Sequence, residues 1–239
     1  MFASEVNKTS GTKFSIKCEK LIYKTKSKFQ RIKIYKSAVY GNIMMLDDCF
    51  MLTEKGNNQY HDKCISLAKT KKKKSNVLII GGGDFGLVKN LFKNVNIKKL
   101  HIVEIDEKVI DVSMKYFPSF FELSKKIKER IIITIDDGYN WLKRNNTVFD
   151  IIIIDCTDPN PIAKKLYSKK FYHNIFNSLN KNGVVIQQSG SPCLNKKDII
   201  VPTINKLSSV GFKDITLNTF SMPIYPLGLW SFIKCKKAR

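Results

Sequence analysis

The second part of the chain repeats one pattern, a short apolar run followed by a stretch long enough for a helix. The apolar runs indicate strands near Val77, Leu100, Ile131, Asp150, Val184 and Ile215, with a last one over residues 229–233. The stretches between them indicate helices over residues 87–93, 107–116, 139–143, 168–179 and 196–210. Strands that alternate with helices are typical of βαβ units and a parallel sheet. We therefore expect a doubly wound, Rossmann-like α/β domain over residues 57–239, opened by a helix over 57–69.

The first part of the chain has shorter, strand-like runs. Strands are expected over residues 16–23, 30–35, 39–46 and 50–52, with turns between them. A length of 239 residues allows one substantial domain with a small one attached. We therefore place a small β-rich N-terminal domain over residues 1–56.

The balance of charge is strongly basic, with 42 Lys and Arg against 20 Asp and Glu and a formal net charge of +22. Such a charge suggests a polyanionic partner. Only four of these basic residues are arginine, however, and arginine is the side chain that bidentate recognition of phosphates and bases favours. The four lysines at 71–74 precede a predicted strand, where a solvated loop is expected. We interpret the lysine excess mainly as surface composition, with a polyanion-binding patch as the alternative.

The apolar runs and the cysteines bear on the compartment. No apolar run approaches the roughly 20 residues needed to span a bilayer, and the N-terminus lacks the pattern of a secretory signal. The six cysteines stand singly with no CxxC spacing, which argues against a zinc site and a disulfide framework. We therefore expect a cytoplasmic protein with reduced thiols, no metal and no membrane association.

The few acidic residues gather where predicted strands end. In the α/β part, Asp84 follows the first strand, Glu104 the second, Asp137 the third, and Asp155 and Asp158 the fourth. Ligands of an open α/β sheet bind outside the carboxyl ends of its strands, and the first and fourth strands are neighbours at the switch point. Asp84, Asp155 and Asp158 are thus expected to converge on one cavity. Because clustered carboxylates are costly unless a cation joins them, the sequence predicts a cationic ligand.

The first of these strands leads into a glycine-rich loop. Gly81, Gly83 and Gly86 fit the pattern G-x-G-x-x-G between a strand and a helix, and Glu104 lies about 20 residues further on, where an acid usually bonds ribose hydroxyls. Asp84 inside the loop would repel a pyrophosphate. The loop therefore suits an adenosine with a cationic sulfonium tail better than a dinucleotide. Capping of the next helix by Asp84, and an ion pair between Glu104 and a lysine, are the structural alternatives.

Asp137 and Gly138 follow the third strand. A carboxylate at this place can accept a hydrogen bond from the amino group of an adenine. A turn residue followed by glycine is the structural alternative.

Further segments combine with these into one set. They are Tyr60-His61-Asp62, residues 77–84 and 103–110, Asp137-Gly138, the DxxDP motif at residues 155–159, Phe171-Tyr172, residues 188–192, and residues 223–230 with Tyr-Pro-x-Gly-x-Trp. Single pieces are common among S-adenosylmethionine methyltransferases, but the set resembles the polyamine aminopropyltransferase (spermidine synthase) family over residues 30–233. The resemblance implies a methyltransferase-like Rossmann fold. It also implies a homodimer or homotetramer formed through the N-terminal β domain, which would also form the lip of the active site.

The resemblance further implies transfer of the aminopropyl group of decarboxylated S-adenosylmethionine to putrescine, giving spermidine and 5'-methylthioadenosine without a cofactor. Matching positions imply a donor site made of Gln30, His61, Gly81, Gly83, Asp84, Glu104, Asp137, Gly138 and Gln188. They imply Asp155 as general base, helped by Tyr60 and Asp158. They also imply an acceptor site of Tyr60, Asp84, Asp158 and Tyr225.

Several positions depart from the family pattern, and three of them bear on the expected acceptor pocket. Phe85 stands where the family has a small residue, so that its ring would crowd the donor or turn into the sheet. Met51 replaces a glutamine near the acceptor, and Lys164 replaces an acid in the loop after Pro159. We expect the core chemistry to be intact and the acceptor pocket to be altered, which leaves the identity of the acceptor amine open.

Two other functions stay open at this stage. An S-adenosylmethionine-dependent methyltransferase would share the fold and the nucleoside site, but Asp84, Asp155 and Asp158 would be hostile to the carboxylate of its donor. A non-catalytic, basic nucleic-acid-binding protein on the same scaffold would show salt-sensitive binding of RNA or DNA and no turnover.

Overall fold

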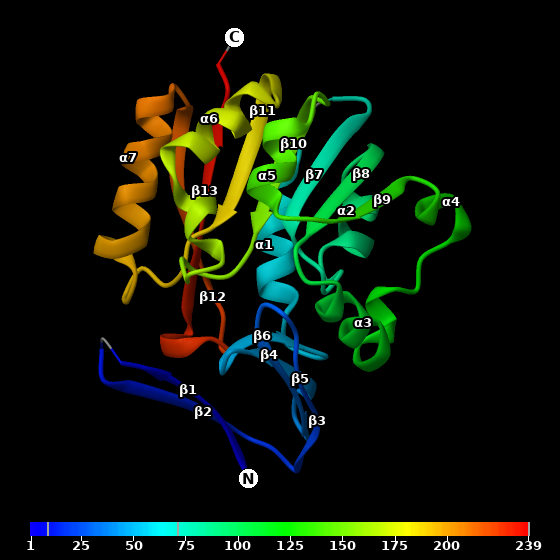
Figure 1. Ribbon diagram of the computed structural model, residues 1–239, viewed down its shortest axis with the longest axis vertical. Coiled ribbons are helices and arrows are strands. Elements are labelled where there is room, and N and C mark those ends of the chain that lie inside the picture. The colour runs from blue at the N-terminus through cyan, green and yellow to red at the C-terminus, as the bar shows by residue number, and fades with distance from the viewer. Residues whose placement is uncertain (9, 71, 239) are drawn as a thin grey trace.

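The computed structural model describes residues 1–8, 10–70 and 72–238, and it places two small β-sheets beneath a larger α/β part (Figure 1). Lys71, the first residue of the lysine run, lies outside the described residues. The large sheet has the order β12-β13-β11-β10-β7-β8-β9. Its strands are β7 (Ser75–Gly81), β8 (Ile97–Glu104), β9 (Ile131–Ile135), β10 (Phe149–Asp155), β11 (Leu179–Gln188), β12 (Lys213–Ser221) and β13 (Leu229–Lys236).

The strand order confirms that the first and fourth strands of the α/β part are neighbours. β7 pairs in parallel with both β8 and β10, and β10 pairs in parallel with β11. β13 runs antiparallel between β11 and β12 at one end of the sheet. The carboxyl ends of β7, β8 and β10 therefore meet at one edge, where a doubly wound sheet binds its ligands.

Helices cover both faces of the large sheet (Figure 1). They are α1 (Asn58–Ala68), α2 (Val88–Asn94), α3 (Glu107–Tyr116), α4 (Lys125–Lys128), α5 (Gly138–Arg144), α6 (Lys169–Asn177) and α7 (Val201–Val210). Ile151 and Ile153 of β10 pack in one core with α1 and α2, whereas Ile152 and Ile154 pack in the other with α5, α6 and α7. Because successive side chains of a strand point to opposite faces, a strand covered on both faces is apolar throughout.

The N-terminal part forms two sheets. β1 (Phe2–Asn7) and β2 (Thr12–Lys17) make a hairpin, and β3 (Lys20–Lys26), β4 (Arg31–Ser37), β5 (Gly41–Leu46) and β6 (Cys49–Thr53) make a four-stranded antiparallel sheet. The prediction of one strand over residues 16–23 was wrong. The backbone N–H of Cys18 donates to Met1 and that of Glu19 donates to Lys36 of β4, so the chain changes sheets between these two residues.

The predicted helices are confirmed, with ends displaced by a few residues. The longest expected helix, over residues 196–210, begins with a π-helical turn over Lys196–Ile200 before α7. All six cysteines are free. Within the described ranges, no helix is long and apolar enough to cross a membrane.

Candidate active site

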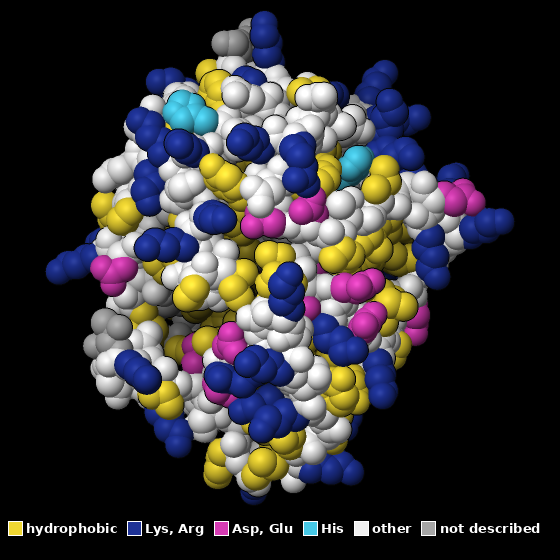
Figure 2. Space-filling model, viewed as in Figure 1, with side chains coloured by type: hydrophobic (Ala, Val, Ile, Leu, Met, Phe, Trp, Pro, Cys, Tyr) yellow, Lys and Arg dark blue, Asp and Glu magenta, His cyan; other side chains and the backbone are white. Residues whose placement is uncertain are grey.

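The carboxyl ends of β7, β8 and β10 open onto a cavity of about 450 Å³, which the N-terminal sheets close from below. Figure 2 shows a hollow on this face with acidic side chains at its rim. Asp and Glu side chains from both parts of the chain line the cavity: Glu5, Asp47, Asp84, Glu104, Asp137, Asp155 and Asp158. The structure thus brings Asp84, Asp155 and Asp158 to one cavity, as their positions after β7 and β10 predicted.

Asp155, the last residue of β10, is hydrogen-bonded to Tyr60 of α1. The Tyr60 hydroxyl donates to Oδ1 of Asp155. The tyrosine ring is held in place by Phe232, whose centroid lies 4.8 Å away, and by Phe220 and Tyr225. Burial and the negative charge of Asp84 raise the pKa of Asp155 to about 7, against the opposing hydrogen bond from Tyr60. This carboxylate is therefore poised to exchange a proton near neutral pH.

The side chain of Asp84 is hydrogen-bonded within the glycine-rich loop that carries it. Its Oδ1 accepts a hydrogen bond of 2.9 Å from the backbone N–H of Gly86, and burial raises the pKa of its carboxyl group. The N-cap residue of α2 is Leu87, which has no side-chain cap. The interpretation of Asp84 as a helix cap was therefore wrong, because the side chain turns back on the glycine loop.

Glu104, at the end of β8, uses both carboxylate oxygens on backbone N–H groups. Oε2 accepts from Gly83 at 3.1 Å and Oε1 from Asp106 at 3.0 Å. Its side chain is buried, and this burial raises its pKa to about 7. A Cβ at Gly83 would stand 2.8 Å from Cγ of Glu104, so the approach of loop to carboxylate requires glycine. Among the described residues no lysine lies within ion-pair distance of Glu104, so the alternative of a structural ion pair was wrong.

Gly81 lets the glycine loop approach β10. Its φ is +85°, in the left-handed region, and a Cβ there would collide with the backbone carbonyl of Asp155. The backbone N–H of Gly82 donates to that carbonyl at 3.1 Å. The loop and the Asp155 carboxylate are consequently held at a fixed separation.

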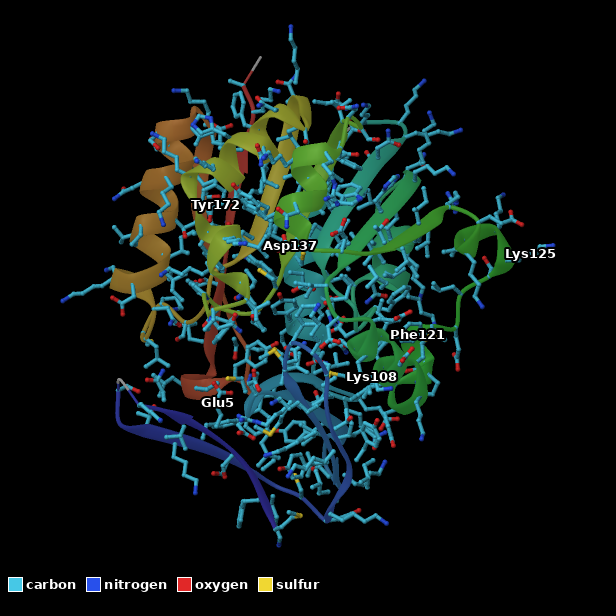
Figure 3. All side chains as sticks on the ribbon, in the orientation of Figure 1. Glu5, Lys108, Phe121, Lys125, Asp137 and Tyr172 are labelled. Carbon is cyan, nitrogen blue, oxygen red and sulfur yellow. The ribbon has the colours of Figure 1, made fainter. Side chains whose placement is uncertain are left out.

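Asp137 is both the N-cap of α5 and a residue of the cavity wall. Its Oδ1 caps α5 by accepting from the N–H groups of Tyr139 (2.8 Å) and Asn140 (3.0 Å). The residue also lines the cavity together with Gly138, which is buried. Figure 3 shows Asp137 at the start of α5 and Glu5 on the N-terminal hairpin, in different parts of the chain.

Three other predicted residues lie at the cavity with distinct surroundings. Gln30 lines it and donates its Nε2 to Oδ2 of Asp106 at 2.9 Å. His61 also lines it and is buried, which lowers the pKa of its imidazole to about 4 and keeps it neutral. Tyr225 lines it and donates its hydroxyl to the backbone oxygen of Met51 at 3.0 Å.

The side-chain amide of Gln188 makes all of its hydrogen bonds within the protein. Nε2 donates to the backbone oxygen of Cys156 (2.8 Å) and to Oδ1 of Asp158 (2.9 Å). Oε1 accepts from the N–H of Gly190 (3.0 Å) and from Nε1 of Trp230 (3.1 Å). Two donors and two acceptors are all that an amide offers. The geometry thus places Gln188 as a support of Asp158.

The three departures from the family pattern have different outcomes. The ring of Phe85 is buried in the core, stacks on Phe121 and does not line the cavity, so of the two alternatives the structure shows the ring turned inward and not towards the donor. Met51 lines the cavity. Lys164 is exposed, and it is its neighbour Lys165 that lines the cavity.

Sequence reasoning missed Glu5. It lies on β1 of the hairpin, lines the cavity and accepts from the N–H of Phe50 at 2.8 Å. Burial, and to a smaller extent the charge of Asp158, raises its pKa to about 7. Phe2 and Val6, the large apolar side chains of the same strand, are exposed and only the small Ala3 is buried, so β1 shows no clear alternation of apolar and polar residues.

The fold and this cavity define a Rossmann-like protein with an acidic cavity at the carboxyl ends of its parallel strands, and comparison with known proteins identifies its family. Residues 57–239 match the family model of the spermine/spermidine synthase domain, and residues 1–54 match that of the spermidine synthase tetramerisation domain. The polyamine aminopropyltransferase of Methanocaldococcus jannaschii is 38% identical over 225 residues, which cover 93% of this chain and 75% of that protein. That of Clostridium botulinum is 35% identical, over 94% of this chain and 78% of that protein.

Two solved structures have the same fold. A spermidine synthase in complex with the transition-state analogue AdoDATO superposes with a TM-score of 0.90 at 27% identity, covering 100% of this chain and 80% of that one. The spermidine synthase of Thermotoga maritima superposes with a TM-score of 0.87, also at 27% identity and with the same coverage. The chain belongs to the spermine/spermidine synthase family and is an aminopropyltransferase.

Proposed function

We propose that this enzyme transfers the aminopropyl group of decarboxylated S-adenosylmethionine to putrescine, giving spermidine and 5'-methylthioadenosine. The observation that carries the proposal is the convergence of Asp84, Asp155 and Asp158 on one cavity beside the Tyr60 hydroxyl. Donor and acceptor are both cations and repel each other in water. Acidic walls offset this repulsion and hold the two at attack distance.

The donor fits the end of the cavity nearest the glycine loop. Glu104 would accept from the ribose hydroxyls and Asp137 from the adenine amino group, and Gly81, Gly83 and Gly138 would border the nucleoside. Asp84, His61 and Gln30 would then surround the sulfonium and the aminopropyl arm. The donor of a methyltransferase carries an additional carboxylate on this arm. That carboxylate would meet Asp84 and Asp155, so the decarboxylated donor is favoured.

The acceptor fits between Asp155 and two further acidic residues, Asp158 and Glu5. Tyr60 and Tyr225 would flank its methylene chain, and Asp158 and Glu5 would bind its distal ammonium. Gln188 would act indirectly, by holding Asp158. This assignment differs from the donor contact that the family pattern implied for Gln188, because its amide is already fully bonded within the protein.

The reaction needs a base at the attacking nitrogen. An alkylammonium has a pKa close to that of lysine, about 10.4, and has no lone pair until a proton leaves. Asp155 would take that proton. The nitrogen then attacks the aminopropyl carbon bonded to sulfur, the C–N bond forms, and the C–S bond breaks with its electron pair moving to sulfur. The sulfonium becomes a neutral thioether, so departure of the leaving group requires no acid.

We also propose that residues 1–56 form a separate N-terminal domain with two functions. It supplies the lip of the cavity through Glu5 and Met51, and it joins copies of the chain into a homodimer or homotetramer. Exposed apolar side chains on this part, at Phe2, Val6 and Val39, support an interface there. The six free thiols are in keeping with the cytoplasmic location that we expect.

The product profile of the purified protein tests the proposed function. We expect spermidine and 5'-methylthioadenosine from decarboxylated S-adenosylmethionine and putrescine, and no methyl transfer from S-adenosylmethionine. Cadaverine and spermidine should be offered in parallel, because Met51 lies in the cavity wall. A folded protein that binds the donor and gives no product with any of the amines would contradict the proposal. Salt-sensitive RNA binding by that protein would instead support the nucleic-acid alternative.

Substitution of Glu5 by glutamine is expected to weaken binding of the acceptor and to leave binding of the donor unchanged. The change removes the charge that would face the distal ammonium and keeps an oxygen that can accept from Phe50. We expect about a tenfold rise in KM for putrescine and an unchanged KM for the donor, since a charged hydrogen bond is worth about 1.5 kcal/mol or more. Steady-state kinetics with each substrate varied in turn measures both. Glu19→Gln, on the exposed surface of the same part of the chain, is the control. Equal changes in the two KM values would argue against the assignment.

The stabilisation produced by the donor is expected to increase with pH. Burial raises the pKa values of Asp155, Glu104 and Glu5 to about 7, above the value of about 4 in an unfolded chain. The folded protein therefore binds protons more tightly, and this contribution to stability is complete below about pH 4 and lost as the pH rises through about 7. A cationic donor compensates the ionised carboxylates. The rise in Tm on adding the donor should be larger at about pH 8 than at about pH 5.5. An equal rise at both pH values would show that these carboxylates do not face the ligand.

A further inference from the structure

Two stacked phenylalanines lie behind the glycine loop. Phe85 is 4% exposed, and its ring stacks on that of Phe121 with centroids 4.4 Å apart and planes at 25°. Phe121 follows the 3₁₀ turn Pro118–Phe120, next to the C-terminal end of α3, and is labelled in Figure 3. The pair therefore ties the loop after β7 to a segment more than 30 residues further along the chain.

The backbone of Phe85 has an unfavourable conformation. Its φ is +62°, in the left-handed region that residues with a Cβ rarely adopt. Its N–H donates to Gly82 at 3.0 Å, and its carbonyl accepts from Val88 at 3.1 Å, so it is part of the turn that carries Asp84. Strain of this kind persists only where the surroundings hold the residue. Here the surroundings that hold Phe85 are these two hydrogen bonds and the stack of its ring on Phe121.

The same segment also supports His61. The ring of Phe120 meets the imidazole of His61 edge-on, with centroids 6.1 Å apart, and stacks on the buried ring of Phe117. Residues 117–121 thus contact two parts of the cavity wall, His61 directly and the Asp84 loop through Phe85. An exposed ion pair between Lys89 and Glu122, 3.9 Å long, adds little to this contact.

We propose that Phe85 and Phe121 are positioning residues, whose stacked rings hold the Asp84 loop in the conformation that binds the donor. The inference rests on the proposed function, in which Asp84 and Gly83 face the donor. We call the stacked pair of Phe85 and Phe121 the brace; Phe85 occupies the position where the family pattern has a small residue. Neither Phe85 nor Phe121 lines the cavity, so neither ring touches the reacting atoms.

Donor binding in a double-mutant cycle tests the proposal. The variants are Phe85→Ala, Phe121→Ala and the double substitution, with Kd for the donor measured by calorimetry and kcat and KM by product formation. Because an aromatic stack contributes beyond its buried area, each single change should raise donor Kd about fivefold. The double variant should resemble the single ones, since either change removes the same stack. KM for the donor should follow Kd, with a smaller change in kcat.

Two further variants separate positioning from general stability. Phe121→Tyr keeps the stack and should restore donor Kd, and Phe85→Gly should impair binding less than Phe85→Ala, because glycine adopts a φ of +62° without strain. Phe176→Ala removes a comparable aromatic contact, the one with Phe212 at 5.1 Å, in the core on the other face of the sheet. It should lower Tm and leave donor Kd unchanged.

Unchanged donor Kd in the single variants, or effects that add in the double variant, would overturn the proposed brace. If the wild-type protein forms spermidine while the variants bind the donor normally, only the brace is rejected. If the wild-type protein forms no product and binds no donor, the proposed function itself is rejected.

Discussion

Asp155→Asn is expected to lower kcat by about three orders of magnitude, within the range that a positioned general base contributes. Asparagine has nearly the same shape and can still accept from the Tyr60 hydroxyl, but it cannot take a proton from the attacking ammonium. Affinity for 5'-methylthioadenosine should be unchanged, because this product is neutral and does not respond to the lost charge. Single-turnover product formation and calorimetry with 5'-methylthioadenosine measure the two quantities.

Tyr60→Phe is the matched variant for this prediction. The hydrogen bond from the Tyr60 hydroxyl lowers the pKa of Asp155, so loss of this hydroxyl should raise that pKa. In the wild-type protein, kcat/KM should rise with pH through about 7, as Asp155 loses its proton. In Tyr60→Phe this rise of kcat/KM should occur at higher pH, and the loss of activity should be smaller than in Asp155→Asn. Asp155→Asn that keeps a tenth or more of the wild-type kcat would rule out Asp155 as the base.

The fold of the α/β part could be predicted because its signals are local and strong. Continuous isoleucine runs such as the one in β10 occur where both faces of a strand are covered, and the segments between the runs are long enough for helices. The N-terminal part was less predictable. β1 and β2 have few buried residues, and the change of sheets between Cys18 and Glu19 depends on hydrogen bonds to Met1 and Lys36, which are distant partners.

Much of the candidate site was predictable for a topological reason. Asp84, Glu104, Asp137 and Asp155 each lie at or just after the end of a parallel strand of one sheet, and the strand order brings these ends together. Glu5 was not predictable in this way, because the hairpin reaches the cavity through tertiary packing alone. The sequence pattern also does not show in which direction a side chain points or which partners it finds. The turn of Phe85 towards Phe121 and the full engagement of the Gln188 amide depend on partners far along the chain.

Glu104→Gln is expected to weaken donor binding by one to two orders of magnitude. Each carboxylate oxygen of Glu104 accepts from a backbone N–H, one from Gly83 and one from Asp106. A glutamine has only one oxygen, so in either orientation its NH₂ group faces an N–H. A buried donor left without its partner costs about 1–3 kcal/mol. The change also removes the acceptor that we propose for the ribose hydroxyls, so the loss should appear in Kd for the neutral 5'-methylthioadenosine.

The pH dependence of this binding distinguishes Glu104 from the other carboxylates. Burial raises the pKa of Glu104 to about 7, so in the wild-type protein a proton replaces one accepting oxygen as the pH falls below that value. Binding of 5'-methylthioadenosine should therefore weaken towards low pH, and Glu104→Gln should bind weakly at every pH. Glu107→Gln makes the same substitution at an exposed position in the first turn of α3, and it should retain the wild-type affinity and pH dependence. A Glu104→Gln protein that binds 5'-methylthioadenosine as the wild type does would remove Glu104 from the nucleoside site.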